Sequence, residues 1–141
     1  VYQAHLWLML LNEDVSFSVE SVERTMGATG VDLTTRAQLQ LSNSVAAQLL
    51  ASFDLPAQQQ IQVTGTTATM RTGEGEAFTL WKQPSTLLIG ETVEHFEADD
   101  AFALMVHGVS AAIEADESTI FPAASSLRAA EITDAIAGFK S

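Results

Sequence analysis

Apolar and polar residues alternate along two segments in the first third of the chain. One alternation covers residues 15–20 and a longer one covers residues 31–42. A β-strand points successive side chains to opposite faces, so an unbroken period of two predicts a strand with one buried face. We therefore predict strands over both segments, with Leu39 on the buried face of the longer one. Thr35 and Gln38 also have the spacing of a helical capping box, but the alternation favours the strand.

The chain opens with an apolar run from Tyr2 to Leu11. The run is about half as long as the roughly 20 residues that a membrane-spanning helix needs, so we predict that it belongs to a protein core. The polar residues 12–14 that follow have the composition of a hairpin turn. We therefore predict that the run is a strand, joined by this turn to the strand at residues 15–20. Residue 1 is Val rather than Met, which indicates either processing or a fragment of a longer chain.

The segment after residue 42 has the spacing of an amphipathic helix. Apolar residues recur at four-residue intervals from Val45 to Phe53, which places them on one helical face. We predict a helix from Asn43 or Ser44 to Phe53. Pro56 ends it, because proline disfavours helical geometry in the residue before it.

Strands are predicted again in the middle of the chain. Residues 61–71 alternate with a change of phase at Gly65, and a β-bulge there would keep the apolar residues on one face. Turns separate this strand from further strands at residues 77–82 and 86–89. The three strands form a predicted meander.

The pattern changes to helical after Gly90. An apolar stripe with helical spacing begins at Phe102, and Asp99 and Asp100 fall in or near the first turn, where the helix dipole favours negative charge. A last helix is predicted from Ser126 to Phe139.

Together these elements predict the fold class. We expect an α+β domain with an antiparallel sheet of about six strands, in the order βββ-α-βββ-αα, and helices packed on one face of the sheet. A length of 141 residues suits one domain, so we predict a single domain over residues 1–141. Cysteine is absent, which excludes disulfides and leaves the cellular compartment open.

The charge of the chain is strongly one-sided. Its 18 acidic and 6 basic side chains give a formal net charge of −12, and no Lys or Arg lies between Lys82 and Arg128. Such a field repels polyanions, so we predict no nucleic-acid partner. The acidic surplus fits either a solvated surface, including adaptation to high salt, or a surface that docks a basic partner.

Two short strings imitate catalytic or cofactor motifs. Gly108 and Ser110 match the start of a nucleophile elbow, but the closing glycine is absent and no histidine follows His107. Gly73 and Gly75 begin like a dinucleotide loop, yet the third glycine position is occupied by phenylalanine and two glutamates would repel phosphate. We predict a flexible turn there, and we predict no catalytic residues and no cofactor.

The acidic segment contains one possible set of metal ligands. Glu94, His95 and Asp99 would offer nitrogen and oxygen ligands to a divalent ion if the following helix began early enough to bring positions 95 and 99 together. Sets of this kind are common by chance in acidic segments. We therefore predict no metal site and keep these three residues as weak candidates.

The absence of a catalytic signature shapes the functional hypothesis. We predict a non-enzymatic interaction or assembly module, a self-associating subunit of a larger complex or particle with protein partners, because long strands with few charges tend to be paired or covered. Two alternatives stay open: a small acidic secretion-type chaperone, and a small pocket protein, either ligand carrier or small enzyme, with an apolar cavity. The residues to inspect for the pocket are Trp7, Phe78, Trp81, His95 and Phe96.

Overall fold

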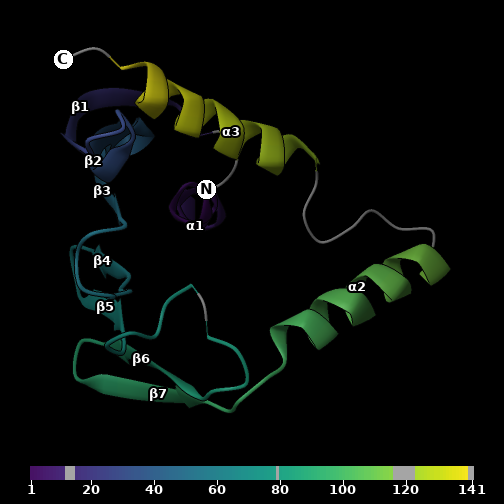
Figure 1. Cartoon of the computed structure of the whole chain (residues 1–141). Coiled ribbons are helices and arrows are strands. Elements are labelled where there is room, and N and C mark those ends of the chain that lie inside the picture. Colours follow the sequence, from purple (N-terminus) through teal and green to yellow (C-terminus); the bar gives the residue numbers. More distant parts are fainter. Residues whose placement is uncertain (12–14, 79, 116–122, 140–141) are drawn as a thin grey trace. The chain divides into compact units, whose positions relative to one another are not determined.

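The computed structural model describes residues 1–11, 15–78, 80–115 and 123–139. The chain divides into two compact units, and Figure 1 shows the elements of each. Unit 1 comprises residues 1–55 and 121–141, and unit 2 comprises residues 56–120. The single domain over residues 1–141 stays a prediction.

Unit 1 combines an antiparallel sheet with two helices. The sheet has three strands in sequential order, and a short 3-10 turn joins the second strand to the third. The elements are α1 (Tyr2–Leu11), β1 (Phe17–Met26), β2 (Asp32–Leu41), η1 (Ser42–Ser44), β3 (Val45–Ser52) and α3 (Ala123–Gly138). The predicted strands at residues 15–20 and 31–42 and the predicted last helix are confirmed, with shifted ends.

The core of unit 1 lies between its sheet and its two helices. Leu39 of β2, Leu8 of α1 and Ile132 of α3 belong to one hydrophobic cluster, and each is at most 2% exposed. Ala47 of β3 joins the same cluster. The predicted orientation of Leu39 is confirmed, since alternate residues of β2 point into this cluster.

Two segments of unit 1 have the opposite structure from the one predicted. Residues Tyr2–Leu11 form the helix α1 rather than a strand, and the buried residues Ala4 and Leu8 are one helical turn apart. Apolar residues occur on all sides of this helix, so the sequence shows no helical periodicity there. The predicted turn at residues 12–14 lies outside the described residues.

The predicted helix from Asn43 or Ser44 to Phe53 is instead strand β3. All eight residues of β3 pair with β2, from Val45 opposite Leu41 to Ser52 opposite Thr34. Alanine, glutamine and leucine favour helices, but that preference is worth only a few tenths of a kcal/mol per residue. Pairing with the long strand β2 outweighs it.

Two arginines tie α3 to β1 and the residues before it. The Arg24 guanidinium donates hydrogen bonds to the carbonyl oxygens of Ile136 and Phe139, at 2.5 and 3.4 Å. The last carbonyls of a helix lack partners within the helix. A positive charge there also interacts favourably with the negative end of the helix dipole. Near the other end of α3, Arg128 donates to the carbonyl oxygen of Val15 at 2.9 Å.

Unit 2 is a small antiparallel sheet followed by one helix. The four strands follow each other in order across the sheet. The elements are β4 (Gln62–Thr64), β5 (Thr69–Thr72), β6 (Ser85–Ile89), β7 (Thr92–Phe96) and α2 (Ala101–Ala115). The predicted strand at residues 86–89 and the helix that begins near Phe102 are confirmed.

The predicted meander of unit 2 needs correction. Residues 61–71 do not form one bulged strand: β4 and β5 form a hairpin, and the amide of Gly65 donates to the carbonyl oxygen of Ala68 at 2.9 Å in its turn. The described residues of 77–82 contain no strand, and β7 was not predicted.

The fold class is therefore confirmed at the coarse level. The described residues form an α+β structure with antiparallel strands. The predicted single sheet of about six strands is replaced by two sheets of three and four strands. No helix among the described residues is both long and apolar enough to cross a membrane.

Candidate functional site

The loop between β5 and β6 begins with a turn that brings Glu76 against β6. The Gly73 amide donates to the carbonyl oxygen of Thr86 at 3.1 Å. Oε2 of Glu76 accepts hydrogen bonds from the backbone amide and the hydroxyl of Thr86, at 2.6 and 2.7 Å. These bonds, the side-chain bond first, hold the pKa of Glu76 below its ordinary value. Glu76 is thus an ionised, fixed carboxylate at neutral pH.

Glycine is required at the start of this turn. A Cβ atom on Gly73 would overlap the Glu76 carboxylate and lie 2.5 Å from Oγ1 of Thr86. Gly75 has a φ of +76°, a conformation that side chains disfavour. The predicted turn is confirmed, and Gly73 allows the close approach of Glu76 rather than the approach of a phosphate.

An open pocket lies beside the Glu76 carboxylate. Its volume is about 300 Å³, and it lies between the β5–β6 loop and the strands β6 and β7. Residues that carry hydroxyl groups and residues with apolar side chains line it together with Glu76. The lining includes Thr72, Glu76, Leu80, Ser85, Thr86 and Phe96.

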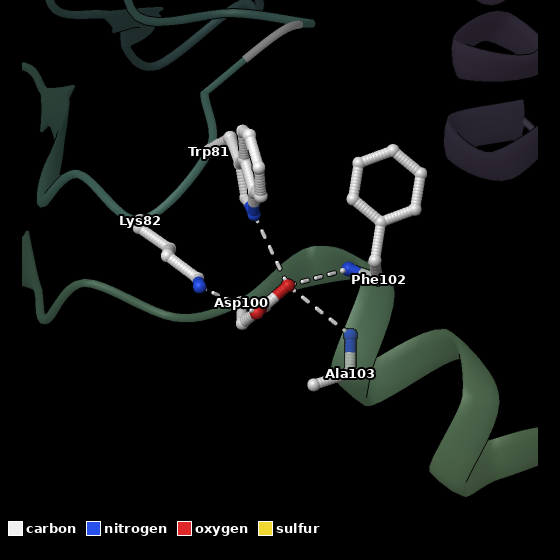
Figure 2. A network of polar contacts seen from close by, with 5 residues as sticks. All are labelled: Trp81, Lys82, Asp100, Phe102 and Ala103. Carbon is white, nitrogen blue, oxygen red and sulfur yellow. Dashed lines mark hydrogen bonds and ion pairs between the residues drawn. The ribbon is translucent and has the colours of Figure 1, made fainter.

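A second polar cluster, which we call the Asp100 network, fixes the far end of the loop to the start of α2 (Figure 2). Oδ1 of Asp100 accepts bonds from the amides of Phe102 and Ala103, at 3.1 and 3.2 Å, in the manner of a helix N-cap. The same oxygen accepts a bond from Nε1 of Trp81 at 3.1 Å, and Oδ2 lies 3.1 Å from Nζ of Lys82.

The Asp100 network lowers the pKa of Asp100, and the hydrogen bond from Lys82 is the largest cause. The Trp81 ring meets the Phe102 ring edge to face at 5.8 Å. Lys82 adopts a φ of +52°, which costs a non-glycine residue about 1–2 kcal/mol. The predicted acidic residue at the entrance of this helix is confirmed in Asp100.

The weak metal candidates are not brought together by a helix. Glu94 and His95 are neighbours on β7, where successive side chains point to opposite faces. Asp99 lies in the segment before α2, which begins only at Ala101. The helix does not begin early enough to bring positions 95 and 99 together, so the condition for this metal site is not met. Among the described residues, no three His, Asp or Glu side chains lie close enough to hold a metal ion.

The other residues singled out from the sequence lie in separate places. Ser110 and His107 are exposed on α2, within a continuous helix rather than at a strand-to-helix turn. Of the pocket candidates, Phe96 lines the open pocket and Trp81 belongs to the Asp100 network. Trp7 lies in α1 of unit 1.

Sequence reasoning missed Glu76 and Thr86. Glu76 and Thr86 are separated by an irregular loop, so no periodic pattern links them. Tyr2 is the single tyrosine of the chain and is 68% exposed at the start of α1, with His5 half-buried one turn later. Its position inside an apolar run concealed its exposure.

Comparisons with known proteins give structural neighbours only. No family model matches the chain, and no curated protein matches it. The chain is similar to KijD10, a 3-ketoreductase from Actinomadura kijaniata solved with NADP and TDP-benzene, at a TM-score of 0.78 and 20% identity over 96% of this chain. An open conformation of KijD10 gives a TM-score of 0.77 at 22% identity, over 97% of this chain and 44% of that one.

A second neighbour is a different reductase. Biliverdin reductase from Synechocystis sp. PCC 6803, solved with biliverdin and NADP+, matches 96% of this chain and 43% of its own length, at a TM-score of 0.60 and 14% identity. At these identities the likeness shows a shared fold. The chain spans less than half the length of these reductases, and 42% of KijD10 in its complex with NADP and TDP-benzene.

The neighbours correct the functional prediction. The prediction of a non-enzymatic assembly module, a structural protein or a secretion-type chaperone is wrong, because the solved structures compared above are reductases with bound NADP. The long strand β2 is paired on both sides, β1 and β3 form the edges of the sheet, and the helices of unit 1 pack on it.

Proposed function

We propose that this chain is the part of an NADP-dependent carbonyl reductase that does not bind the dinucleotide. The likeness to KijD10 over 96% of the chain is the observation that carries the proposal. Because the chain spans 42% of that reductase, the proposed enzyme also contains a dinucleotide-binding part.

The residues of this chain support such a division of labour. Dinucleotides bind where a glycine-rich loop joins a strand to a helix in a parallel sheet. All the strand pairs described here are antiparallel. The loop with Gly73 and Gly75 carries the Glu76 carboxylate, which repels phosphate. The NADP phosphates therefore bind elsewhere in the proposed enzyme.

We assign the proton donor of the proposed reaction to Tyr2. Reduction of a carbonyl adds a hydride to carbon and a proton to oxygen, and the cofactor supplies only the hydride. A phenol is a weak acid that can donate to a developing alkoxide. Tyr2 is exposed at the beginning of α1, and one of the KijD10 structures is of a tyrosine-to-phenylalanine variant. His5 follows at i+3, on the same side of the helix.

The test is NADPH oxidation by the natural gene product that contains these residues, with a series of ketones that includes nucleotide-linked keto sugars. We expect NADPH to be consumed. The Tyr2→Phe variant should lower kcat by about 10²–10⁴-fold, the usual contribution of a general acid, with little change in KM. The matched control is Met9→Leu, at an exposed position on the same helix, which should leave kcat unchanged. Failure of the gene product to bind NADPH would contradict the proposal.

The predictions about the binding partners of the chain are kept as proposals. We propose that the chain associates with protein and not with nucleic acid, because its charge of −12 repels polyanions. The homo-oligomer stays a prediction, which native mass spectrometry of the gene product would measure.

A further inference from the structure

We propose that the open pocket of unit 2 binds an organic cation whose ammonium group is held by Glu76. The site stands on the geometry of unit 2 alone. It requires neither NADP nor the carbonyl chemistry of the proposed function, so each can fail without the other.

The Glu76 carboxylate is positioned to accept hydrogen bonds from a ligand. Both bonds from Thr86 go to Oε2, so they fix the carboxylate and do not occupy Oε1. Thr72 and Ser85 also line the pocket, and Oγ1 of Thr72 accepts a hydrogen bond from the amide of Ile61 at 3.1 Å. An ammonium group has three donors and no acceptor, which matches the acceptor oxygen of a carboxylate.

The rest of the pocket suits the carbon part of such a ligand. Leu80, Leu87 and Phe96 also line it, and Phe96 is 48% exposed, so part of its ring is accessible. An aromatic face attracts a cation, and apolar side chains accept its hydrocarbon. A volume of about 300 Å³ accommodates a small molecule.

The net negative charge of residues 56–120 favours a ligand with a positive charge. Residues 56–120 contain ten acidic side chains and only two basic ones, Arg71 and Lys82. Lys82 is paired with Asp100. This field attracts cations and repels anions. A bare metal ion is a poorer fit, since among the residues described no group of three acidic or histidine ligands exists.

The wall of the pocket is held at both ends. Glu76 is bound to β6 at one end of the loop, and the Asp100 network binds Trp81 and Lys82 at the other (Figure 2). The carbonyl oxygen of Asp99 also accepts a bond from the amide of Lys82 at 3.2 Å. The residues at these two attachments lose little entropy when a ligand binds, because they are already held in place.

The experiment is an NMR titration of the whole chain with benzylammonium, at low salt and about pH 8. Benzyl alcohol has the same shape without the charge, and benzoate reverses the charge. We expect benzylammonium to bind with a dissociation constant of a few millimolar, benzyl alcohol about tenfold more weakly, and benzoate not at all; tenfold corresponds to about 1.4 kcal/mol. The shifted amides should be those of the pocket lining.

Matched variants separate the pocket from general charge attraction. Glu76→Gln and Glu74→Gln remove the same charge from the same turn, but only Glu76 lines the pocket. We expect Glu76→Gln to weaken benzylammonium binding about tenfold and Glu74→Gln less than twofold. Phe96→Ala, which leaves the bonds of Glu76 intact, should also weaken binding.

Three results would overturn the proposal. Equal weakening by the two glutamate variants would mean attraction to the acidic surface only. Equal binding of benzyl alcohol would remove the role of the carboxylate. Unchanged binding by Phe96→Ala, with shifts outside the pocket lining, would place the ligand elsewhere.

Discussion

The two units of the chain hold their shape in different ways. All the fully buried hydrophobic side chains among the described residues belong to unit 1, with Leu8, Leu39 and Ile132 at its centre. In unit 2 no described residue is buried. Its helix α2 is rich in apolar residues, yet Phe102 is 62% and Ile113 is 75% exposed.

The difference shows which interactions each unit depends on. Burial stabilises by roughly 25 cal/mol per Å² of apolar surface, while one hydrogen bond contributes only about 0.5–1.5 kcal/mol net. Unit 1 therefore tolerates polar changes on its surface and fails when its core changes. Unit 2 depends on strand pairing, the tight position of Gly73 and the carboxylates Glu76 and Asp100, so single polar residues matter more there.

The largest effect is expected from a charge in the core of unit 1. Leu39→Asp places a carboxylate at a site that is 2% exposed, and we expect unit 1 to unfold, a loss above about 4 kcal/mol. Gln38→Asp adds the same charge to the exposed face of the same strand and should change stability by less than about 0.5 kcal/mol. Circular dichroism in urea measures both. Equal urea midpoints for the two variants would contradict the assignment of Leu39 to the buried face of β2.

Truncation of one isoleucine in each unit sharpens the comparison. Ile132→Ala opens a cavity in unit 1 and should cost about 2–5 kcal/mol. Ile113→Ala, at an exposed position of α2, should cost less than about 0.5 kcal/mol. Thermal unfolding of the two variants provides the measurement. A larger loss from Ile113→Ala would mean that α2 is covered by other parts of the protein in solution.

A smaller effect is expected from an added methyl group in unit 2. Gly73→Ala forces the Glu76 carboxylate away from Thr86, and overpacking of this kind costs about 1–3 kcal/mol. Gly138→Ala is the matched control, because a Cβ there meets no atom within 4 Å. The amide chemical shift of Thr86 reports the displacement. An unchanged shift in Gly73→Ala would contradict the tight turn.

The smallest expected effect is a local response to acid. Hydrogen bonds lower the pKa of Asp100 in the folded chain from its ordinary value of 3.8. Its stabilising effect is therefore complete above the unfolded value and is lost as the pH falls through the lowered folded value. We expect the amides of Phe102 and Ala103 to lose protection from hydrogen exchange below about pH 4.

The variant Asp100→Asn provides the control for this acid response. It keeps an oxygen for the helix cap but does not titrate, so the pH dependence at these amides should disappear. Persistence of the acid response in this variant would assign it to another group, with Glu76 as the first candidate because its pKa is lowered for the same reason.

Periodic segments of the sequence were sufficient to predict part of the fold. The alternation around Leu39 identified β2 and its buried face, and the stripe beginning at Phe102 identified α2. The run Tyr2–Leu11 and the segment Val45–Ser52 were assigned the wrong structure. The first has no polar side to give a period. The second has helical composition, and only its pairing with β2 makes it a strand.

The candidate site was less accessible to sequence reasoning. Glu76 and Thr86 meet through a loop without a repeating pattern, and the role of Gly73 depends on that meeting. Asp100 was predictable at the helix entrance, because capping is local in sequence. Its bonds to Trp81 and Lys82 depend on the path of the loop and could not be predicted.

The attachment of α3 to the start of the chain has a consequence for biosynthesis. Arg24 binds carbonyls more than a hundred residues later, and the residues of unit 2 lie between them. A ribosome therefore completes all of unit 2 before it supplies the helix that covers the sheet of unit 1. Until then the nascent chain displays Leu39 and its neighbours to solvent or to a chaperone, whereas the local pairings of unit 2 can form as they emerge.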